Sequence, residues 1–390
     1  MKLKDLIENN NTGLDAIKRA PIVDYDTGIR CLRIGDISNN RPFNDWGYTE
    51  VEDNNYNKFQ LKAGDIIVAR TGATIGVNKY IDKDYKSVYN NGLIRIRVKE
   101  ENNPKYVYYL LQSNNYKSFI KTISMGTSTQ PNMQMNDLLN LEVPNFDREK
   151  QDKIVQLLGS IDKKIELNNE INNNLYELAI NYLNEKSESN EVSVSKFAKI
   201  QGGYAFKSKD LLDIYTKNRI IKIKNLRSEI NADVINSQFV EDEVIEKLDD
   251  KFKLRKGDVA IAMTGAELGK TGFIYGNDNY YLNQRVGVIR ENNKASELYL
   301  KVFFLSEEFQ SLLNSKGYGS AQPNVSTSDI ENILINDITE DNLNEFYKTI
   351  KPIYEKIISN SDEILNLEIL RNTLLPKLMN GEIDLDNIEI

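Results

Sequence analysis

Apolar residues recur every three or four positions along two long stretches of the chain. In the first, from Asp147 to Glu185, they lie at Ile154, Leu158, Ile161, Ile165, Leu175 and Leu178, with a polar interruption over residues 168–174. In the second, from about Asn342 to Met379, they include Ile357, Ile364, Leu367, Leu374 and Leu378. This period predicts two amphipathic helices, each roughly 50 to 60 Å long at about 1.5 Å per residue. Because so narrow an apolar stripe needs another helix to cover it, we expect the two to pair as an antiparallel coiled coil.

The segments that precede these helices repeat each other. Residues 61–76 read LKAGDIIVARTGATIG and residues 254–269 read LRKGDVAIAMTGAELG, 193 positions later in a chain of 390. In addition, CLRIGDI (31–37) matches IIKIKNL (220–226), and GTSTQPNM (126–133) matches GSAQPNV (319–325). The CLRIGDI and IIKIKNL runs alternate between apolar and polar residues, which predicts half-buried strands. A repeat of this length indicates duplication of a whole folding unit rather than a solenoid.

The order of these elements predicts an α+β protein. It contains two mixed α/β domains that are related by an internal pseudo-two-fold duplication and separated by the two long helices. We assign residues 1–146 to the first domain, 147–188 to the first long helix, 189–340 to the second domain, and 341–390 to the second long helix with an acidic tail. The first half contains no clear copy of IQGGYAFKSKD (200–210), which leaves the start of the first domain open.

Composition excludes most catalytic chemistry. The chain has no histidine and a single cysteine, Cys31, which excludes imidazole-based acid/base catalysis, the common hydrolytic triads, thiolate metal clusters and internal disulfides. No apolar run reaches the roughly 20 residues of a membrane span, and the start MKLKDLIENNN lacks the apolar core of a signal peptide. We therefore expect a folded cytoplasmic protein with no membrane contact and no bound metal.

One stretch is close to a phosphate-binding loop. TGAELGKT (264–271) fits G-x-x-x-x-G-K-[ST] except that Thr264 replaces the first glycine, and the matching TGATIGVN (71–78) lacks the lysine and threonine. We interpret both segments as turns whose glycines are kept for backbone shape. An adenine methyltransferase is excluded in a similar way, because the chain has neither an Asn-Pro-Pro-aromatic tetrapeptide nor a glycine-rich methyl-donor loop. These absences favour a binding protein over an enzyme.

The net charge of −8 is unevenly distributed. Residues 1–140 carry a net charge of +3 and residues 190–325 carry +2, whereas the remaining segments, mostly helix and tail, carry −13. The two near-neutral domains hold basic clusters with interleaved tyrosine and asparagine, and such surfaces bind DNA phosphates while a few Arg, Asn and Gln contacts read bases. Ordinary solvated strand faces have the same composition, and a pI near 5.1 is far from that of a simple DNA binder. Two modules held at a set spacing nevertheless suit a duplex with its own approximate two-fold symmetry.

The combined pattern resembles the specificity subunit of type I restriction-modification systems. It comprises a strand, GD(I/V)xxAxTGAxxG, an asparagine-rich strand near Asn90 and Asn283, a QPN loop and then a long helix. IQGGYAFKSKD, EKQDKIVQLLGSIDKKIE (149–166) and LLPKLMNGEI (374–383) also look like family signatures. The resemblance covers essentially the whole chain.

This resemblance implies a DNA sequence-specificity subunit that is not itself catalytic. In the family, each domain is a target recognition domain that reads one half of a bipartite double-stranded DNA site, and the helices set the spacer and dock two methyltransferase subunits. Those partner subunits bind S-adenosylmethionine and methylate adenine, so no cofactor is expected on this chain. Motor-nuclease (restriction) subunits join some of these complexes. The two domains differ strongly outside their shared scaffold, which implies an asymmetric site.

Candidate DNA-contacting residues are the polar and basic side chains beside the shared loops. They are Arg70, Thr71, Lys79, Asn90, Asn91, Arg95, Gln130 and Asn132 in the first domain, and Lys207, Thr264, Lys270, Asn283, Gln284, Arg285, Gln322 and Asn324 in the second. A loop-stabilising hydrogen bond is the competing interpretation for each, and it has equal weight for Gln130, Asn132, Gln322 and Asn324. The apolar residues of the two helices named above mark the elements on which partner subunits are expected to dock. Because shared residues cannot distinguish two half-sites, base reading is expected where the domains diverge.

Two alternatives stay open. The specificity subunit of a related restriction-methylation enzyme with a different catalytic partner would have the same kind of sequence. A structural coiled-coil adaptor would have the same helices but no DNA readout.

Overall fold

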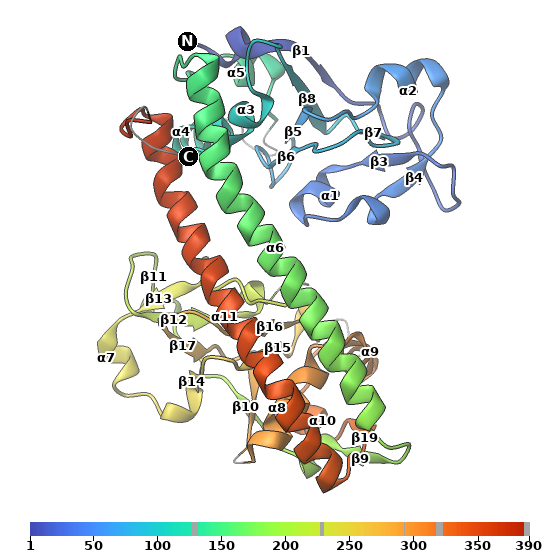
Figure 1. The fold of residues 1–390 in the computed structure, drawn as a ribbon, viewed down its shortest axis with the longest axis vertical. Coiled ribbons are helices and arrows are strands. Elements are labelled where there is room, and N and C mark those ends of the chain that lie inside the picture. The colour runs from blue at the N-terminus through green and yellow to red at the C-terminus, as the bar shows by residue number, and fades with distance from the viewer. Residues whose placement is uncertain (126–131, 227–229, 292, 317–322, 386–390) are drawn as a thin grey trace. The chain divides into compact units, whose positions relative to one another are not determined.

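The computed structural model describes residues 1–125, 132–226, 230–291, 293–316 and 323–385. The chain forms two compact units (Figure 1). The first unit consists of Met1–Ile161 and Leu370–Ile390, and the second of Asp162–Ile369. Each long helix is therefore shared between the units: α6 (Arg148–Lys186) ends in the second unit, and α11 (Glu340–Met379) ends in the first.

The first unit contains two four-stranded sheets. The central sheet is antiparallel, in the order β1-β8-β5-β6, and the second sheet has the order β2-β4-β3-β7. The strands are β1 (Ile7–Thr12), β2 (Ile22–Val23), β3 (Arg30–Leu32), β4 (Gly47–Thr49), β5 (Ile66–Ala69), β6 (Asn78–Tyr80), β7 (Ser87–Tyr89) and β8 (Leu93–Val98). The helices besides α6 and α11 are α1 (Ile34–Ser38), α2 (Asp53–Phe59), α3 (Pro104–Leu110), α4 (Asn114–Met125) and α5 (Met135–Leu139).

The second unit repeats this plan. Its central sheet has the order β10-β18-β15-β16, and its second sheet has the order β11-β13-β12-β17-β14. The strands are β10 (Lys199–Gly202), β11 (Leu211–Leu212), β12 (Asn218–Ile221), β13 (Gln238–Val240), β14 (Lys253–Leu254), β15 (Val259–Ala262), β16 (Thr271–Phe273), β17 (Asn279–Leu282) and β18 (Val286–Arg290), and β9 (Glu191–Ser193) pairs separately with β19 (Leu334–Asn336). The helices are α7 (Asp242–Ile245), α8 (Lys294–Phe304), α9 (Glu307–Lys316) and α10 (Thr327–Glu331).

The duplication predicted from the sequence is confirmed at the level of topology. Both central sheets have the same strand order, and in both second sheets one strand pair is parallel, β3 with β7 and β12 with β17. The first strand of each parallel pair, β3 or β12, also carries an arginine that lies over an aromatic ring of its antiparallel neighbour, β4 or β13. The Arg30 guanidinium is 4.0 Å from the Tyr48 ring centroid, and that of Arg219 is 4.4 Å from the Phe239 centroid.

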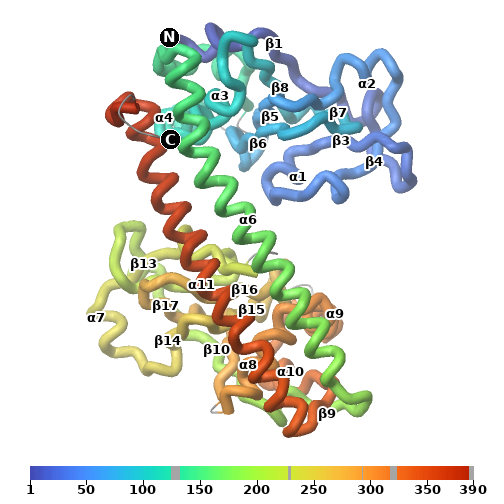
Figure 2. The backbone as a smooth tube through the Cα atoms, in the orientation of Figure 1, coloured from blue at the N-terminus to red at the C-terminus, as the bar shows by residue number. Residues whose placement is uncertain are grey.

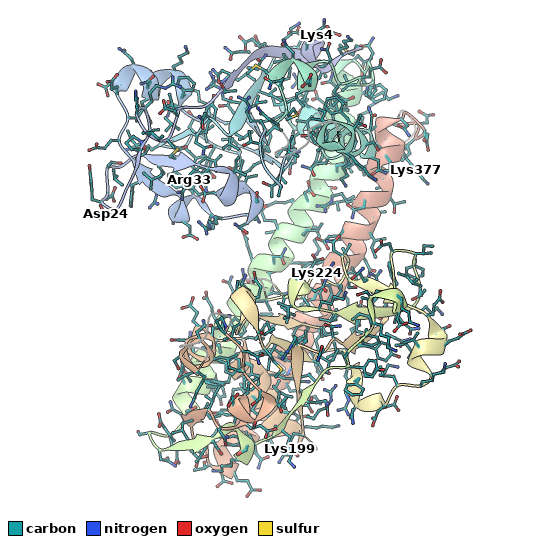
Figure 3. The ribbon with its side chains drawn as sticks, turned by 180° about the vertical axis from the view of Figure 1, so that it is seen from behind. Lys4, Asp24, Arg33, Lys199, Lys224 and Lys377 are labelled. Atoms are coloured by element: carbon teal, nitrogen blue, oxygen red, sulfur yellow. The ribbon has the colours of Figure 1, made fainter. Side chains whose placement is uncertain are left out.

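The strands predicted over residues 31–37 and 220–226 are correct only for the first two residues of each. Strand β3 ends at Leu32 and β12 at Ile221, and each is followed by a helical turn. The side chains of Asp36 and Asn225 cause this change, because each accepts a hydrogen bond from a backbone N–H three residues earlier, on Arg33 (2.9 Å) and Lys222 (3.0 Å). Figure 3 marks Arg33 before α1, and Lys224 in the turn after β12.

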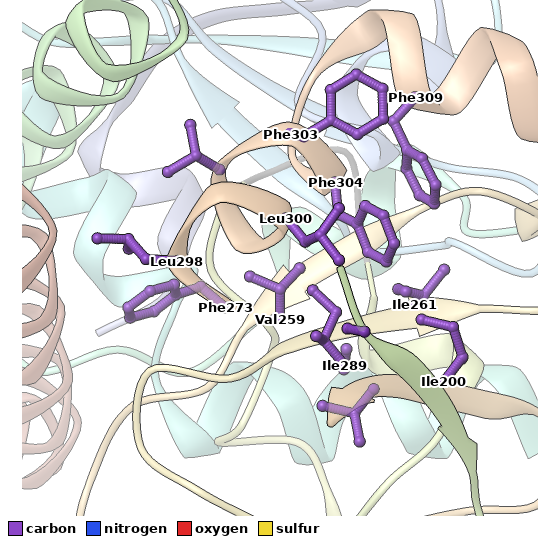
Figure 4. Packing of buried hydrophobic residues seen from close by; sticks show 14 of the residues in the cluster. Ile200, Val259, Ile261, Phe273, Ile289, Leu298, Leu300, Phe303, Phe304 and Phe309 are labelled. Atoms are coloured by element: carbon purple, nitrogen blue, oxygen red, sulfur yellow. The ribbon is translucent and has the colours of Figure 1, made fainter. Parts of the chain in front are cut away.

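The core of the second unit lies between its central sheet and helices α8 and α9. Figure 4 shows Val259, Ile261 and Ile289 of the sheet beneath aromatic rings of these helices. The rings of Phe304 and Phe309 are stacked, with centroids 4.1 Å apart. Burial of such side chains stabilises a fold by about 1.5 to 3 kcal/mol each, so this layer holds β15 and β18 in place.

A buried carboxylate holds the same pair of strands in each unit. Asp65, just before β5, pairs with Arg97 of β8 at 2.7 Å, and Asp258, just before β15, pairs with Arg290 of β18 at 2.9 Å. Asp258 also meets Lys301 of α8 at 3.1 Å. The GD dipeptide shared by the two halves is therefore a structural feature, since its aspartate ties neighbouring strands together.

The two long helices run antiparallel where they pair in the second unit (Figure 2). Lys186 near the end of α6 contacts Glu345 near the start of α11 at 2.9 Å, and Asn168, earlier in α6, donates to Glu363, later in α11, at 3.0 Å. The rings of Tyr182 and Phe346 stack between these contacts. This confirms the predicted long helices and their antiparallel pairing.

Candidate nucleic-acid interface

One end of the central sheet of the first unit collects segments that are far apart in the sequence. Thr71, after β5, forms a bridge with Asn132. The backbone N–H of Arg70 donates to the Gly92 carbonyl at 2.9 Å, which joins the end of β5 to the start of β8. Leu14, after β1, forms a parallel bridge with Asn90. The loops that carry the predicted contacts thus meet at a single edge.

The second unit assembles the same edge. Thr264 forms a bridge with Asn324, and the backbone N–H of Met263 donates to the carbonyl of Arg285 at 3.0 Å. Tyr204 forms a parallel bridge with Asn283. We call these two sets of segments the loop edges of the first and second units.

Glycines set the shape of the turn at each loop edge. Gly72 and Gly76 have φ of 83° and 87°, and Gly265 and Gly269 have φ of 78° and 81°. Only glycine adopts this region without strain, which confirms that the shared TGAxxG stretch is kept for its backbone. Lys270, the residue that would complete a phosphate loop, is instead ion-paired with Glu267.

A second glycine feature was not recognised from the sequence. A Cβ at Gly203 would overlap the carbonyl oxygen of Asn283, and a Cβ at Gly13 would overlap that of Tyr89. Gly13 is thus the structural counterpart of Gly203, and the segment from Gly13 onward replaces GGYAFKS in the first unit. The glycine is the one residue that the two segments share, because the residues that follow it differ position by position.

Ten of the predicted DNA-contacting residues lie at the two loop edges. They are Arg70, Thr71, Asn90, Asn91 and Asn132 in the first unit, and Thr264, Asn283, Gln284, Arg285 and Asn324 in the second. Gln130 and Gln322 lie outside the described residues. Among the ten, Asn91, Asn132, Gln284, Arg285 and Asn324 are exposed.

The other predicted residues have different surroundings. Arg95 is only 1% exposed, and its guanidinium donates to the backbone carbonyls of Lys58 and Gln60, so its cation serves the interior of the unit. Burial lowers the pKa of the Arg95 guanidinium and of the half-buried Lys79 ammonium. Lys207 is exposed, three residues after Tyr204. Arg95 is therefore left out of the DNA contacts proposed below, because its side chain is enclosed.

Most of the apolar helix residues are enclosed as well. Ile154, Leu158 and Leu378 are buried in the core of the first unit, Ile357 in that of the second, and Ile161, Ile165 and Ile364 are also buried. Leu175, Leu367 and Leu374 are half-buried. Leu178 alone of the predicted set is exposed, at 52%, and it shares α6 with exposed Leu167 and Ile171. The stripe is consequently an internal seam, and a different face of α6 is open.

Two residues of the polar interruption of the first helix face the seam rather than solvent. Asn168 and Asn172 are buried, and Asn172 bonds to both Asn360 and Ser361 of α11. Ser361 in turn donates to Asn231 at 3.0 Å. A hydrophobic period alone does not reveal such a layer, because it counts buried asparagines as surface positions.

Neither a metal centre nor a membrane helix is found in the described parts of the chain. No group of three or more His, Cys, Asp or Glu side chains there has an arrangement that would hold a metal ion. No described helix is long and apolar enough to cross a membrane.

Known proteins provide the comparison. The family model of the type I restriction modification DNA specificity domain matches residues 1–177 and 204–337. The MjaIX specificity subunit of Methanocaldococcus jannaschii is 24% identical over 328 residues, covering 77% of this chain and 73% of that protein. The HindI specificity subunit of Haemophilus influenzae is 28% identical over 152 residues, which cover 38% of this chain and 33% of that protein. The crystal structure of a type I S subunit from M. genitalium has a TM-score of 0.52 at 16% identity, covering 97% of this chain and 95% of that one.

Two copies of one sheet-and-helix fold, each with a polar loop edge, define a duplicated recognition protein. The chain belongs to the type I restriction modification DNA specificity family, whose model matches both units. It is a specificity subunit with two DNA specificity domains, and catalysis falls to other subunits of such systems.

Proposed function

We propose that each unit reads one half of an asymmetric, bipartite duplex DNA site through its loop edge. The observation that carries this proposal is the convergence of ten predicted polar and basic residues on two equivalent edges. The edges share their backbone frame but differ in side chains, for example Asn91 against Gln284 and Ile17 against Lys207. A shared frame with unlike side chains suits two different half-sites, because phosphate contacts position a protein and base contacts specify the sequence.

The long helices, in this proposal, fix the spacer between the half-sites and dock two methyltransferase subunits. A second, exposed stripe on α6 supports docking. It consists of Leu167, Ile171 and Leu178, which lie at helical spacing and are not covered by α11. The partner subunits would bind S-adenosylmethionine and methylate adenine in the cytoplasm. Restriction subunits would join the same complex.

The proposal is tested by co-expressing the chain with its methyltransferase subunit and mapping methylated adenines across a genome. We expect one asymmetric motif with a fixed gap. Exchange of residues 190–325 for another recognition unit should change one half-site only. A continuous motif, or a motif unchanged by the exchange, would refute the proposal.

Docking is tested separately by co-purification. Leu178→Asp should reduce recovery of the methyltransferase subunit. The substitution removes apolar surface that the contact would bury, and it places a carboxylate where removal from water costs free energy. Asn169→Asp, at another exposed position of α6 that lies outside the stripe, is the matched control. Equal recovery for both variants would argue against docking on this stripe.

A further inference from the structure

An arginine lies beside the asparagine of the QPN segment in both units. Arg70 Nη2 donates to Asn132 Oδ1 at 3.2 Å in the first unit. Arg285 Nη1 donates to Asn324 Oδ1 at 3.2 Å in the second. The two asparagines are equivalent, because each forms a bridge with the threonine of its TG turn.

The two arginines are not equivalent in the chain. Arg70 follows β5, and the corresponding residue after β15 is Met263. Arg285 precedes β18, and the corresponding residue before β8 is Gly92. These positions are backbone neighbours, since Arg70 N–H donates to Gly92 and Met263 N–H donates to Arg285. The guanidinium has therefore changed strands between the units while keeping its place beside the asparagine.

Two ordinary reasons for a guanidinium beside this asparagine in both units do not apply. The two arginines do not occupy equivalent positions of the repeat, and neither side chain is packed in a core. Arg285 is exposed and Arg70 is half-exposed. Among the described residues, no carboxylate lies within ion-pair distance of either side chain, in contrast to Arg97 and Arg290 on the same sheets. A side-chain amide oxygen occupies one N–H of a guanidinium that carries five. The Nε–H of Arg70 is enclosed without a partner, but the remaining Nη donors of each guanidinium are held in one plane that suits the oxygens of a phosphate.

We propose that Arg70 and Arg285 are phosphate anchors that bind the DNA backbone without regard to sequence, and that Asn132 and Asn324 are positioning residues that orient them. This inference rests on the proposed function. An anchor common to both units is expected to act on affinity, whereas discrimination between bases falls to side chains that differ between the loop edges. The position of the charge in space is what both units retain, because a phosphate recognises charge and hydrogen-bond donors and not the strand that supplies them.

The first experiment measures binding of the complex of the full chain and its methyltransferase subunit to two duplexes over a range of salt concentrations. One duplex of 40 base pairs carries the mapped motif, and the other has both half-sites scrambled. Arg285→Ala should weaken binding to both duplexes by a similar factor, about tenfold each, and lower the log–log salt slope by about 1. The methylated motif should stay the same. Arg255→Ala, an exposed arginine before the opposite end of β15, should leave both quantities unchanged.

The second experiment moves the arginine between strands. Met263→Arg combined with Arg285→Ala rebuilds in the second unit the arrangement of the first, and it should recover most of the lost affinity and the salt slope. Asn324→Ala should weaken binding less than Arg285→Ala and should also lower the slope, which a purely structural role would leave intact. Circular dichroism and recovery of the methyltransferase subunit establish that each variant is folded.

The possible outcomes separate the anchor from the function as a whole. A wild-type complex that binds the two duplexes equally well would refute the proposed function. If the wild type discriminates but Arg285→Ala binds like it, or alters a base of the methylated motif, the anchor proposal is wrong. A folded double variant that recovers neither affinity nor slope would also overturn it, because charge at that place would then not be what the DNA recognises.

Discussion

Asn360 donates a hydrogen bond of 2.9 Å to Asn172 across the seam between the long helices, and both side chains are only 2% exposed. The Asn172 amide in turn donates to the Ser361 hydroxyl, and that hydroxyl donates to Asn231 of a loop in the same unit. Buried asparagine in a helix seam favours one register over others, because a shifted register leaves its amide unpaired. The helix pair and the loop are thus joined by one polar network.

Removing one member of this network should be costly. Asn172→Ala leaves the buried amide of Asn360 without its acceptor and removes the N–H that donates to the Ser361 hydroxyl, so we expect the free energy of unfolding to fall by about 1 to 3 kcal/mol. The measurement is the urea midpoint of the transition that reports the second unit. Asn169→Ala, three residues earlier and exposed, should be neutral or slightly stabilising because alanine is the better helix former. Equal midpoints for the two variants would contradict a structural role for the network.

The buried Asp258 should be among the residues most sensitive to substitution. Asp258→Ala removes the carboxylate that faces Arg290 and Lys301 and leaves two cations without it, so we expect destabilisation by about 3 to 5 kcal/mol. Thermal unfolding followed by circular dichroism measures the change. Asp213→Ala, at an exposed position, is the control and should shift the transition little. A transition that moves no further for Asp258→Ala than for this control would show that the cations find other partners.

Two adjacent glycines provide a matched pair for the close approach at the second loop edge. A Cβ at Gly203 would overlap the carbonyl of Asn283, whereas a Cβ at Gly202 would lie 3.5 Å from Thr327 Cγ2, an ordinary contact. Gly203→Ala should therefore destabilise the protein by about 1 to 3 kcal/mol and weaken DNA binding, because the segments of Gly203 and Asn283 must move apart to make room for the Cβ. Gly202→Ala should do neither. Unfolding midpoints and duplex binding measured on both variants decide the matter, and similar values for the two would remove the steric argument.

Cys31 should be unreactive in the folded protein. Its side chain is buried, and burial raises the pKa of the thiol to about 12, so the thiol stays protonated at pH 8. A thiol reagent such as Ellman's reagent should modify it only after guanidinium chloride is added. Ser189→Cys, at an exposed position, should be modified at once under native conditions. Rapid modification of the wild-type chain at pH 8 would show that the strand opens readily.

A large part of the fold could be predicted because its signals are a period and a repeat, which can be seen along the chain without knowledge of contacts. The helical period predicted α6 and α11, and the repeated GD and TG segments predicted two related units. The turns after β3 and β12 were missed because one side chain, Asp36 or Asn225, redirects a run that alternates like a strand. The first-unit copy of the Gly203 segment was missed because Gly13 is the one residue that the two segments have in common.

The candidate site divides in the same way. Residue type and proximity to the shared loops pointed to Arg70, Asn132, Arg285 and Asn324, but not to their pairing. Arg95 is also a basic residue close to the shared loops, but it is enclosed, because β8 is buried on both of its faces over residues 93–96.

The sequence by itself determined that the chain contains one frame twice and two long helices, because repetition and period are properties of residues close together or identical along the chain. Only the tertiary structure decided which residues share an edge. Arg70 and Gly92 are 22 positions apart, yet they become neighbours through the pairing of β5 with β8, and the corresponding pairing of β15 with β18 brings Met263 beside Arg285. Contacts across strands depend on how the whole sheet closes, so the place of a guanidinium can be kept while its position in the chain changes.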